Sequence, residues 1–360
     1  MDGARVTPAM LVNHERVRAW AVACLSAARV PHDDAVTVAN ALTRTSLWGV
    51  DSHGVLRLTH YLARIEAGSI KPNADVLVKQ SGSCTAQMDG DDGLGIVHCV
   101  RGMTMAMEMA ARSGVGIVGI GGSSHCGAVG LYTRQAAAAH LIGIAFTHAD
   151  AIVIPHGGKQ KYFGTNPVSI AFPRAGGEPV CLDMATSQVA WNKVMNARME
   201  NQPLKAGLTV DAAGEATNDP HAAAALLPLG GEHYGHKGYG LALMIDLLCG
   251  ALNGMTFGPN ITPMYRELDR PRRIGHLLLA IDPARFAGAG TLEAVASEMV
   301  LDLKRRGDIL YPGEPEYLRE AERLQNGIPI EAGALADMNV WSDKLGVPRL
   351  AEQVNRNHAL

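Results

Sequence analysis

The sequence predicts an α/β fold in which a mixed sheet forms the middle of the chain and helices form both ends. Three observations carry this prediction. Apolar residues recur at helical spacing over residues 11–70, short apolar runs alternate with helical patterns over 74–284, and helical patterns return after 291. Helices on both sides of the sheet region predict one discontinuous helical domain, residues 1–73 with 285–360, beside a sheet domain of residues 74–284.

The N-terminal helices are defined by their apolar faces and by the residues that break them. Residues 11–30 carry one apolar face, and Pro31 ends the pattern. A second helix reaches Trp48. A third begins at Asp51 and stops at Gly68, a residue type that commonly ends helices.

Between these helical ends, runs of apolar and β-branched residues alternate with helical patterns. The expected strands are residues 76–78, 85–88, 115–120, 142–147, 168–172, 180–184 and 274–281. The expected helices are residues 95–112, 128–140, 188–199 and 238–252.

Composition places the chain among globular proteins and excludes several function classes. The 360 residues are 47% hydrophobic and carry a net charge of -3, so neither nucleic acid nor a membrane surface is an expected partner. The longest apolar helix falls short of the ~20 residues that span a bilayer. The six cysteines form no metal-ligand spacing, and no secretory signal is evident, so we expect no metal and a cytoplasmic location.

The segment Gly119–Gly130 is the strongest candidate for chemistry. It follows the expected strand 115–120, precedes a helix, and carries His125 at the helix start. Glycines let backbone approach a ligand, and a helix start attracts anions and disfavours an imidazolium. The segment therefore predicts a proton-transfer histidine beside an anion-binding turn, with an ordinary loop or capping histidine as the alternative.

One dinucleotide-binding pattern, GxGxxG, occurs at residues 114–119. In the doubly wound fold these glycines follow a strand and open a helix. Here they follow a helix and open a strand, so we reject the motif and expect a fold that is not of the Rossmann type.

A second candidate lies in the third helix. His53, Arg57 and Tyr61 are successive fourth residues, which share one face of a continuous helix. An imidazole, a guanidinium and a phenol in one row suit a small carboxylate, because Arg binds carboxylates through two hydrogen bonds. A solvated face is the alternative interpretation.

Four further motifs each allow a structural and a functional interpretation. Gly164–Pro167 is a turn with side-chain hydrogen-bonding groups, and Asp183–Ser187 is either a helix cap or a ligand contact. Lys237–Gly240 is expected to open an apolar helix, where a lysine and free N–H groups suit a phosphate. Tyr311–Glu314 reads as a turn and helix start.

These segments occur in one order along most of the chain, and together they resemble the type 2 malate/L-lactate dehydrogenase family. That non-Rossmann group also contains ureidoglycolate and sulfolactate dehydrogenases, diketogulonate reductases and piperideine-2-carboxylate reductases. The matching segments are Asp51–Gly54, Arg57, Tyr61, Gly121–Gly127, Gly164–Pro167, Asp183–Ser187, Lys237–Leu241 and Tyr311–Glu314.

The resemblance implies a nicotinamide cofactor, NAD or NADP, and hydride transfer at carbon two of a small 2-hydroxy or 2-oxo acid. It also implies a homodimer with its active sites near the subunit interface. The implied catalytic or substrate-binding residues are His125, His53, Arg57, Tyr61 and Asp183. The implied cofactor contacts are Ser52, Thr165, Asn166, Asp183, Met184, Ala185, Lys237, Gly238, Tyr311, Pro312, Gly313 and Glu314.

Two departures from the family pattern leave the substrate open. Cys126 follows the acid/base histidine where many relatives carry an aromatic residue, and Ala149 stands where relatives often carry serine. Either Asp183 or Asp150 is expected to orient a histidine or bind the cofactor, and the sequence does not choose.

Several functions compete with the 2-hydroxy acid dehydrogenase. Within the family, reduction of a cyclic imine or of a diketogulonate uses the same hydride transfer. Outside it, Cys126 with a histidine suggests a cysteine hydrolase, and purely structural histidines would leave a non-enzymatic binding protein. The sequence does not specify the substrate, the cofactor or the direction.

Overall fold

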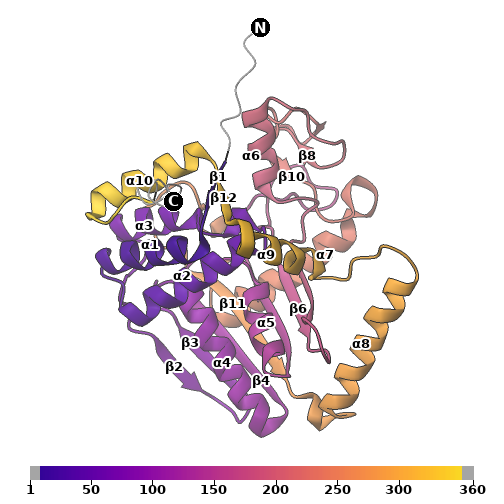
Figure 1. Cartoon of the computed structure of the whole chain (residues 1–360). Coiled ribbons are helices and arrows are strands. Elements are labelled where there is room, and N and C mark those ends of the chain that lie inside the picture. The colour runs from indigo at the N-terminus through magenta and orange to yellow at the C-terminus, as the bar shows by residue number, and fades with distance from the viewer. Residues whose placement is uncertain (1–8, 351–360) are drawn as a thin grey trace. The chain divides into compact units, whose positions relative to one another are not determined.

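The computed structural model describes residues 9–350, which fall into two compact units (Figure 1). Within the described range, one unit comprises residues 9–73 and 313–350, and the other runs from Ala74 to Pro312. Residues 285–312, which the sequence analysis placed with the helical domain, therefore belong to the sheet unit. Their helix α8 (Ala289–Arg305) is held there because Ser297 Oγ donates to Ala175 O at 2.7 Å.

A seven-stranded mixed sheet forms the centre of the second unit. Its strands are β2 (Leu77–Gln80), β3 (Thr85–Asp89), β4 (Val115–Ser123), β5 (Ile142–Thr147), β6 (Val168–Phe172), β7 (Val180–Met184) and β11 (Ile274–Ile281). They lie in the order β2-β3-β4-β11-β5-β6-β7. Only β3 and β4 are parallel, and every other pair in this sheet is antiparallel. The predicted mixed sheet is thereby confirmed.

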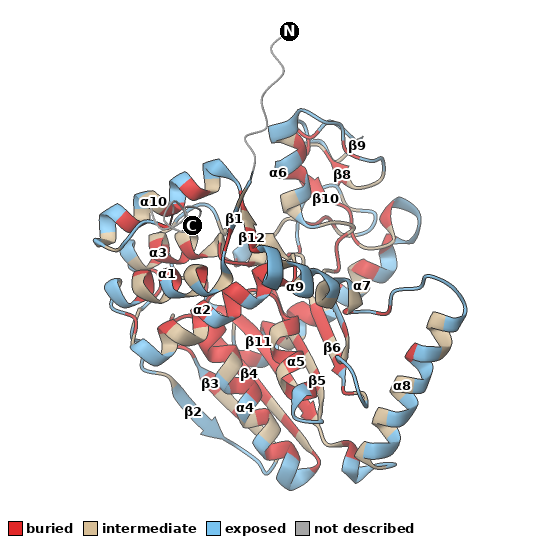
Figure 2. Cartoon of the chain, viewed as in Figure 1, coloured by how far each residue is buried: buried red, intermediate tan, exposed pale blue. Residues whose placement is uncertain are grey.

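Helices cover both faces of this sheet, and alternate residues of β11 pack against the helices on one face or the other. Leu278 and Ala280 point into a core shared with α4 (Gly95–Ser113) and α5 (Gly130–Ala138). Leu277 points to the opposite face, where Ile245 and Cys249 of α7 (Gly231–Cys249) pack. The alternation follows from the two-residue period of a strand. Figure 2 shows the resulting band of buried residues along the central strands.

The rejected GxGxxG pattern has a packing role. Gly114 ends α4 in the left-handed region, with φ 84°. A Cβ on Gly116 would lie 2.0 Å from the Ala106 carbonyl oxygen, and one on Gly119 would lie 2.1 Å from Asn253 Oδ1. These glycines therefore let α4 and the 3-10 turn η2 (Ala251–Asn253) approach the sheet closely.

The sheet unit also contains elements that the sequence analysis did not anticipate. A three-stranded sheet of two-residue strands accompanies helix α6 (Trp191–Glu200). Its strands are β8 (Thr209–Val210), β9 (Ala216–Thr217) and β10 (Ala225–Leu226), and the remaining 3-10 turns are η3 (Gly258–Asn260) and η4 (Pro283–Arg285).

The helical unit joins segments from both sides of the sheet unit in the sequence. Its helices are α1 (His14–Ala27), α2 (His32–Leu47), α3 (Arg57–Glu66), α9 (Glu314–Asn326) and α10 (Ala332–Leu345). Trp20 Nε1 donates to Ser342 Oγ at 2.8 Å and so links α1 to α10. Residues 11 and 12, expected to be helical, instead belong to β1 (Met10–Val12), because this strand pairs antiparallel with β12 (Ile328–Ile330).

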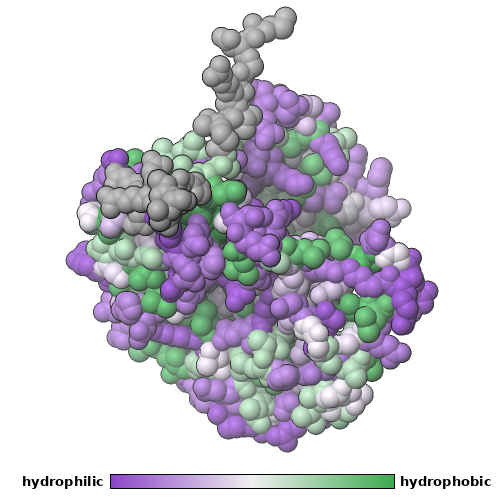
Figure 3. All heavy atoms as spheres, in the orientation of Figure 1, coloured by the Kyte–Doolittle hydropathy of each residue, from purple (hydrophilic) through white to green (hydrophobic). Residues whose placement is uncertain are grey.

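On the face viewed in Figure 3, hydrophobic residues appear as patches between hydrophilic ones. Within the described range 9–350, every helix is too short or too polar to cross a bilayer.

Candidate active site

His125 lies in the turn between β4 and α5, and this turn is fixed on both sides of the histidine. Gly95 N, at the start of α4, donates to Ser124 Oγ at 2.9 Å, and the Tyr132 hydroxyl donates to Cys126 O. His125 itself is partly exposed, and its Nδ1 accepts a hydrogen bond from Gly127 N at 3.2 Å. With Nδ1 as the acceptor, the hydrogen of the neutral ring is on Nε2.

Asp183 contacts the same helix start from another strand. It is exposed at the end of β7, and its Oδ2 accepts a hydrogen bond from Gly130 N at 2.7 Å. A carboxylate stabilises the partial positive charge of a helix N-terminus. Asp183 thus caps α5, which is distant in sequence, and not α6, the helix that follows it in the chain, whose N-cap Ala190 makes no side-chain hydrogen bond. This contact places Asp183 beside the segment that carries His125.

Three chain segments converge next to this strand end. Thr186 donates to the Thr165 carbonyl oxygen through both its amide (2.8 Å) and its hydroxyl (2.9 Å). Leu229 N donates in turn to Thr186 O at 2.8 Å. Thr165, Met184 and Ala185 are partly exposed around this junction, so they can contact a ligand there.

Asn166 has a different role from its neighbour Thr165. It is fully buried, and its Oδ1 accepts a hydrogen bond from Ala149 N at 3.1 Å. Its Nδ2 donates to Ala242 O at 3.0 Å and to Asp246 Oδ2 at 3.3 Å. The amide therefore ties the turn to α7, and the geometry gives Asn166 a structural position rather than a direct cofactor contact.

The expectation that Lys237–Gly240 opens a helix is wrong. Helix α7 begins at Gly231, because Gly230 and Gly231 both adopt positive φ and turn the chain before it. Lys237 lies well inside the helix, where backbone N–H groups already have partners, as Gly238 N has in Leu229 O. The Lys237 side chain is exposed, with Nζ 5.7 Å from the Tyr234 ring centroid.

The Tyr311-Pro312 pair lies along the outer edge of β7. Pro312 O accepts a hydrogen bond from Cys181 N at 2.9 Å. Tyr311 is buried, and its hydroxyl accepts a hydrogen bond from Arg174 Nη2 at 3.2 Å. These contacts bring the pair to the strand that carries Asp183, as a ligand role for the segment requires.

In the helical unit, the Ser52-His53 pair occupies the short turn η1 (Asp51–His53). Ser52 Oγ and His53 Nδ1 are 2.9 Å apart, and Arg57 Nε donates to Ser52 O. Burial, together with the charge of Arg57, lowers the pKa of His53 to about 4, so this imidazole is neutral at neutral pH. Asp51 accepts from Arg323 of α9, with Nη2–Oδ2 at 2.9 Å, which anchors the turn.

His53, Arg57 and Tyr61 do not form the continuous helical row that their spacing predicted. The extended Gly54, with ψ −154°, separates η1 from α3, which starts at Arg57. Tyr61 is only 1% exposed and packs inside the helical unit. In the same unit Gly313, with φ 96°, precedes α9, and Glu314 is the first residue of that helix.

Of the two candidate carboxylates, Asp150 is paired elsewhere. It forms an ion pair with the buried Arg272, and its Oδ2 accepts a hydrogen bond from Met264 N at 3.2 Å. Asp183 therefore remains the candidate near His125.

A buried imidazole–carboxylate pair was not predicted from the sequence. His148 Nδ1 lies 2.9 Å from Asp246 Oδ1, and Gly275 N donates to His148 Nε2 at 2.8 Å. Burial lowers the pKa of His148, although Asp246 opposes this effect. The signal was an aspartate inside the apolar pattern of α7, a place where a carboxylate needs a partner.

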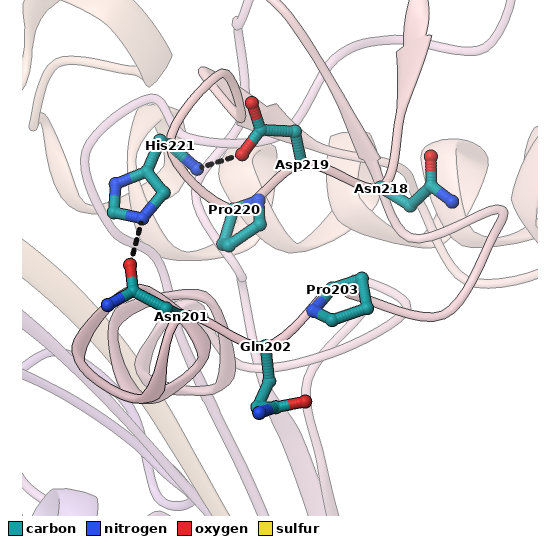
Figure 4. Close-up of a pocket in the computed structure, with 7 residues that line it drawn as sticks. All are labelled: Asn201, Gln202, Pro203, Asn218, Asp219, Pro220 and His221. Atoms are coloured by element: carbon teal, nitrogen blue, oxygen red, sulfur yellow. Dashed lines mark hydrogen bonds between the residues drawn. The ribbon is translucent and has the colours of Figure 1, made fainter. Parts of the chain in front are cut away.

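Two sites that suggest other chemistry do not support it. Cys126, the nucleophile of the hydrolase alternative, is 2% exposed and belongs to the α4–α5 core, which removes it from contact with a substrate. A surface depression of about 360 Å³ follows α6 and is shown in Figure 4. Its lining residues are Asn201, Gln202, Pro203, Asn218, Asp219, Pro220 and His221, none of which was a predicted site residue.

The structure thus defines an α/β protein whose mixed sheet leads to a histidine in the turn before one helix and a carboxylate at the start of that helix. The malate/L-lactate dehydrogenase family model matches residues 12–339, and the chain belongs to this family. It is accordingly an NAD(P)-dependent dehydrogenase.

Two curated relatives and two solved structures illustrate the similarity. Ureidoglycolate dehydrogenase (NAD(+)) of Escherichia coli O157:H7 is 35% identical over 85% of this chain and 88% of the relative. (2R)-3-sulfolactate dehydrogenase (NADP(+)) of Chromohalobacter salexigens is 35% identical over 87% of this chain and 92% of the relative. Sulfolactate dehydrogenase from Methanocaldococcus jannaschii has a TM-score of 0.87 at 31% identity, covering 95% of this chain and 99% of that one. Delta1-piperideine-2-carboxylate reductase from Pseudomonas syringae has a TM-score of 0.84 at 29% identity, covering 92% of this chain and 99% of that one.

Proposed function

We propose that this dehydrogenase interconverts a small 2-hydroxy acid and its 2-oxo acid, with ureidoglycolate, malate and sulfolactate as the first substrates to test. The observation that carries the proposal is the shared helix start of α5. There the turn before the helix carries the partly exposed His125, and Asp183 holds the first helical amide. A general base beside an ordered turn is what removal of a hydroxyl proton requires.

The residues divide the reaction between them. A bound nicotinamide would accept the hydride that leaves carbon two of the substrate. His125 is the group that exchanges the hydroxyl proton, and Arg57 fixes the carboxylate through its guanidinium. The neutral imidazole of His53 hydrogen-bonds the substrate oxygen, a role that the low pKa of this group favours.

Cofactor contacts are proposed along the end of β7. The exposed Asp183 and the partly exposed Thr165, Met184 and Ala185 suit this role because they gather at the junction of three segments. Lys237 offers an exposed ammonium on the second turn of α7 for a phosphate oxygen. Ser52, Tyr311, Pro312, Gly313 and Glu314 remain further proposed contacts.

The decisive experiment compares His125→Ala with the matched control His140→Asn. His140 follows the other end of α5, is exposed, and has φ 63°, which asparagine tolerates. His125→Ala should lower kcat roughly 10²- to 10⁴-fold and leave NADH binding, followed by fluorescence, intact. Equal kcat values for the two variants would contradict the role of His125.

The substrate is identified with the same assay. Ureidoglycolate, malate, sulfolactate, their 2-oxo acids and a cyclic imine are each offered with NAD and NADP, and absorbance of the reduced nicotinamide is followed. The imine arm is included because of the similarity to the piperideine-2-carboxylate reductase structure. Arg57→Ala should reduce kcat/KM for the best acid roughly 10- to 100-fold, since a hydrogen-bonded charge is lost.

The proposed assembly is a homodimer in the cytoplasm. Helix α7 exposes Leu241, Met244 and Leu247, apolar side chains at a spacing of three residues that a second copy would cover. All six cysteines are free thiols, as expected for a reducing compartment. Sedimentation equilibrium measures the mass of the assembly directly.

A further inference from the structure

Three side chains from separate elements of the sheet unit meet in its core. Cys99 lies on α4, Cys126 lies in the turn before α5, and His276 lies on β11. Their nearest sulfur and nitrogen atoms all lie within 4.8 Å of one another. Each residue is at most 2% exposed, so no solvent competes for these atoms.

The imidazole of His276 is oriented as a ligand. The Thr147 hydroxyl donates to the carbonyl oxygens of His148 (3.3 Å) and Gly275 (3.5 Å). A hydroxyl hydrogen given to either carbonyl leaves the Thr147 oxygen to accept the hydrogen of His276 Nδ1, 2.7 Å away, and the lone pair of the ring is then on Nε2. Histidine ligands in metal sites are commonly fixed in this way by a hydrogen bond from the other ring nitrogen.

Nε2 of His276 is fully buried and has no hydrogen-bond partner among residues 9–350. A buried polar atom without a partner is costly, and a native core normally satisfies it. A ring nitrogen of His276 lies within 4.8 Å of the sulfurs of Cys99 and Cys126. A cation held by all three groups would remove this cost.

We propose that Cys99, Cys126 and His276 form a binding site for a soft d10 cation, zinc or cuprous copper. Thiolate and imidazole donors select such ions. In a zinc complex with Zn–S bonds of about 2.3 Å, the two sulfurs lie about 3.8 Å apart, so small side-chain adjustments suffice. Zinc displaces one proton from each thiol, and two thiolates, one neutral imidazole and Zn²⁺ carry no net charge, which suits a buried site.

Because Cys126 directly follows His125, occupancy would fix the turn that carries the proposed general base.

The test measures metal directly and does not depend on turnover, so its failure is distinct from failure of the proposed dehydrogenase. The full chain is isolated under reducing conditions from zinc-supplemented cells and, in a second arm, loaded with cuprous ion. Metal analysis should find one equivalent of one of the two ions after dialysis against a weak chelator. Cobalt substitution should give the thiolate-to-metal charge-transfer band of two sulfur ligands.

Cys99→Ser, Cys126→Ser and His276→Gln should each abolish this stoichiometric metal. Thr147→Val removes the positioning bond together with the long contacts to the His148 and Gly275 carbonyls, and should weaken binding roughly 10- to 100-fold. Cys24→Ser is the matched control, because Cys24 is an equally buried thiol with burial raising its pKa to about 12. Metal content unchanged by the three ligand variants, or the absence of any retained ion and cobalt band in wild type, would overturn the proposal.

Discussion

Two glycine-rich segments lead into helices of the sheet unit, residues 119–130 before α5 and residues 230–240 around the start of α7. Before α5, the glycines form a turn that exposes His125 and ends at an amide held by Asp183. Around α7, Gly230 and Gly231 start the helix early. Gly238 then packs against the backbone of Leu229, where a Cβ would lie 2.5 Å from both N and O. Glycines near a helix start thus form a turn in the first segment and make room for backbone packing in the second, so their presence alone does not indicate a ligand site.

Among the substitutions that test this comparison, Gly238→Ala should change the free energy of unfolding most. The new methyl group meets the Leu229 backbone, so the free energy of unfolding should fall by about 3 kcal/mol. Gly240→Ala in the same helix is the matched control, since no atom lies within 4 Å of its Cβ, and it should gain up to about 1 kcal/mol. Urea denaturation measures both, and equal changes would show that Gly238 is not a packing glycine.

Acid should lower the free energy of unfolding through His98, a residue of α4 that contacts the end of the strand before the α5 segment. Its Nδ1 lies 2.8 Å from Ser123 Oγ at the end of β4, and burial lowers the pKa of His98 to about 3. The unfolded chain takes up this proton near pH 6.5, whereas the folded chain takes it up only near pH 3. The free energy of unfolding should therefore fall by about 1.4 kcal/mol for each pH unit between these values.

The measurement for this prediction is urea denaturation at several pH values for wild type and His98→Gln. Glutamine can still bond Ser123 but does not titrate, so its profile should be flatter by the stated slope. Parallel profiles would contradict the assignment of this proton to His98.

The smallest effect tests the cap of α5. Asp183→Asn keeps an acceptor for Gly130 N but removes the charge, and should cost about 1 kcal/mol in the absence of nicotinamide. Glu232→Gln is the control at the corresponding end of α7, where the carboxylate is exposed and the cost should be a few tenths of this value. Thermal unfolding resolves the two, and a larger loss for Glu232→Gln would reverse our interpretation of the helix starts.

Much of the fold was predictable because long apolar runs have an unambiguous period. Strands β5, β6, β7 and β11 have the predicted bounds. The three-residue strands β1 and β12 and the two-residue strands β8–β10 were missed, since so few residues cannot establish alternation. The start of α7 was misplaced because glycine is a poor helix former and masks the first turns of the helix.

The candidate site was predictable as residues but not as contacts. His125 and Asp183 were identifiable because each stands at a junction between a strand and a helix. That Asp183 caps α5, or that Asn166 faces inward to Asp246, depends on pairings between distant segments that local sequence does not encode. The core position of Cys126 likewise follows from packing against α4 rather than from its neighbours in the chain.

The pairing of β1 with β12 has a consequence for biosynthesis. Met10–Val12 leaves the ribosome early, yet its partner Ile328–Ile330 emerges only after the entire sheet unit has been translated. The apolar faces of the N-terminal helices therefore stay partly exposed while the intervening unit folds first. Nascent chains halted before Ile328 should consequently recruit chaperones through the N-terminal helices.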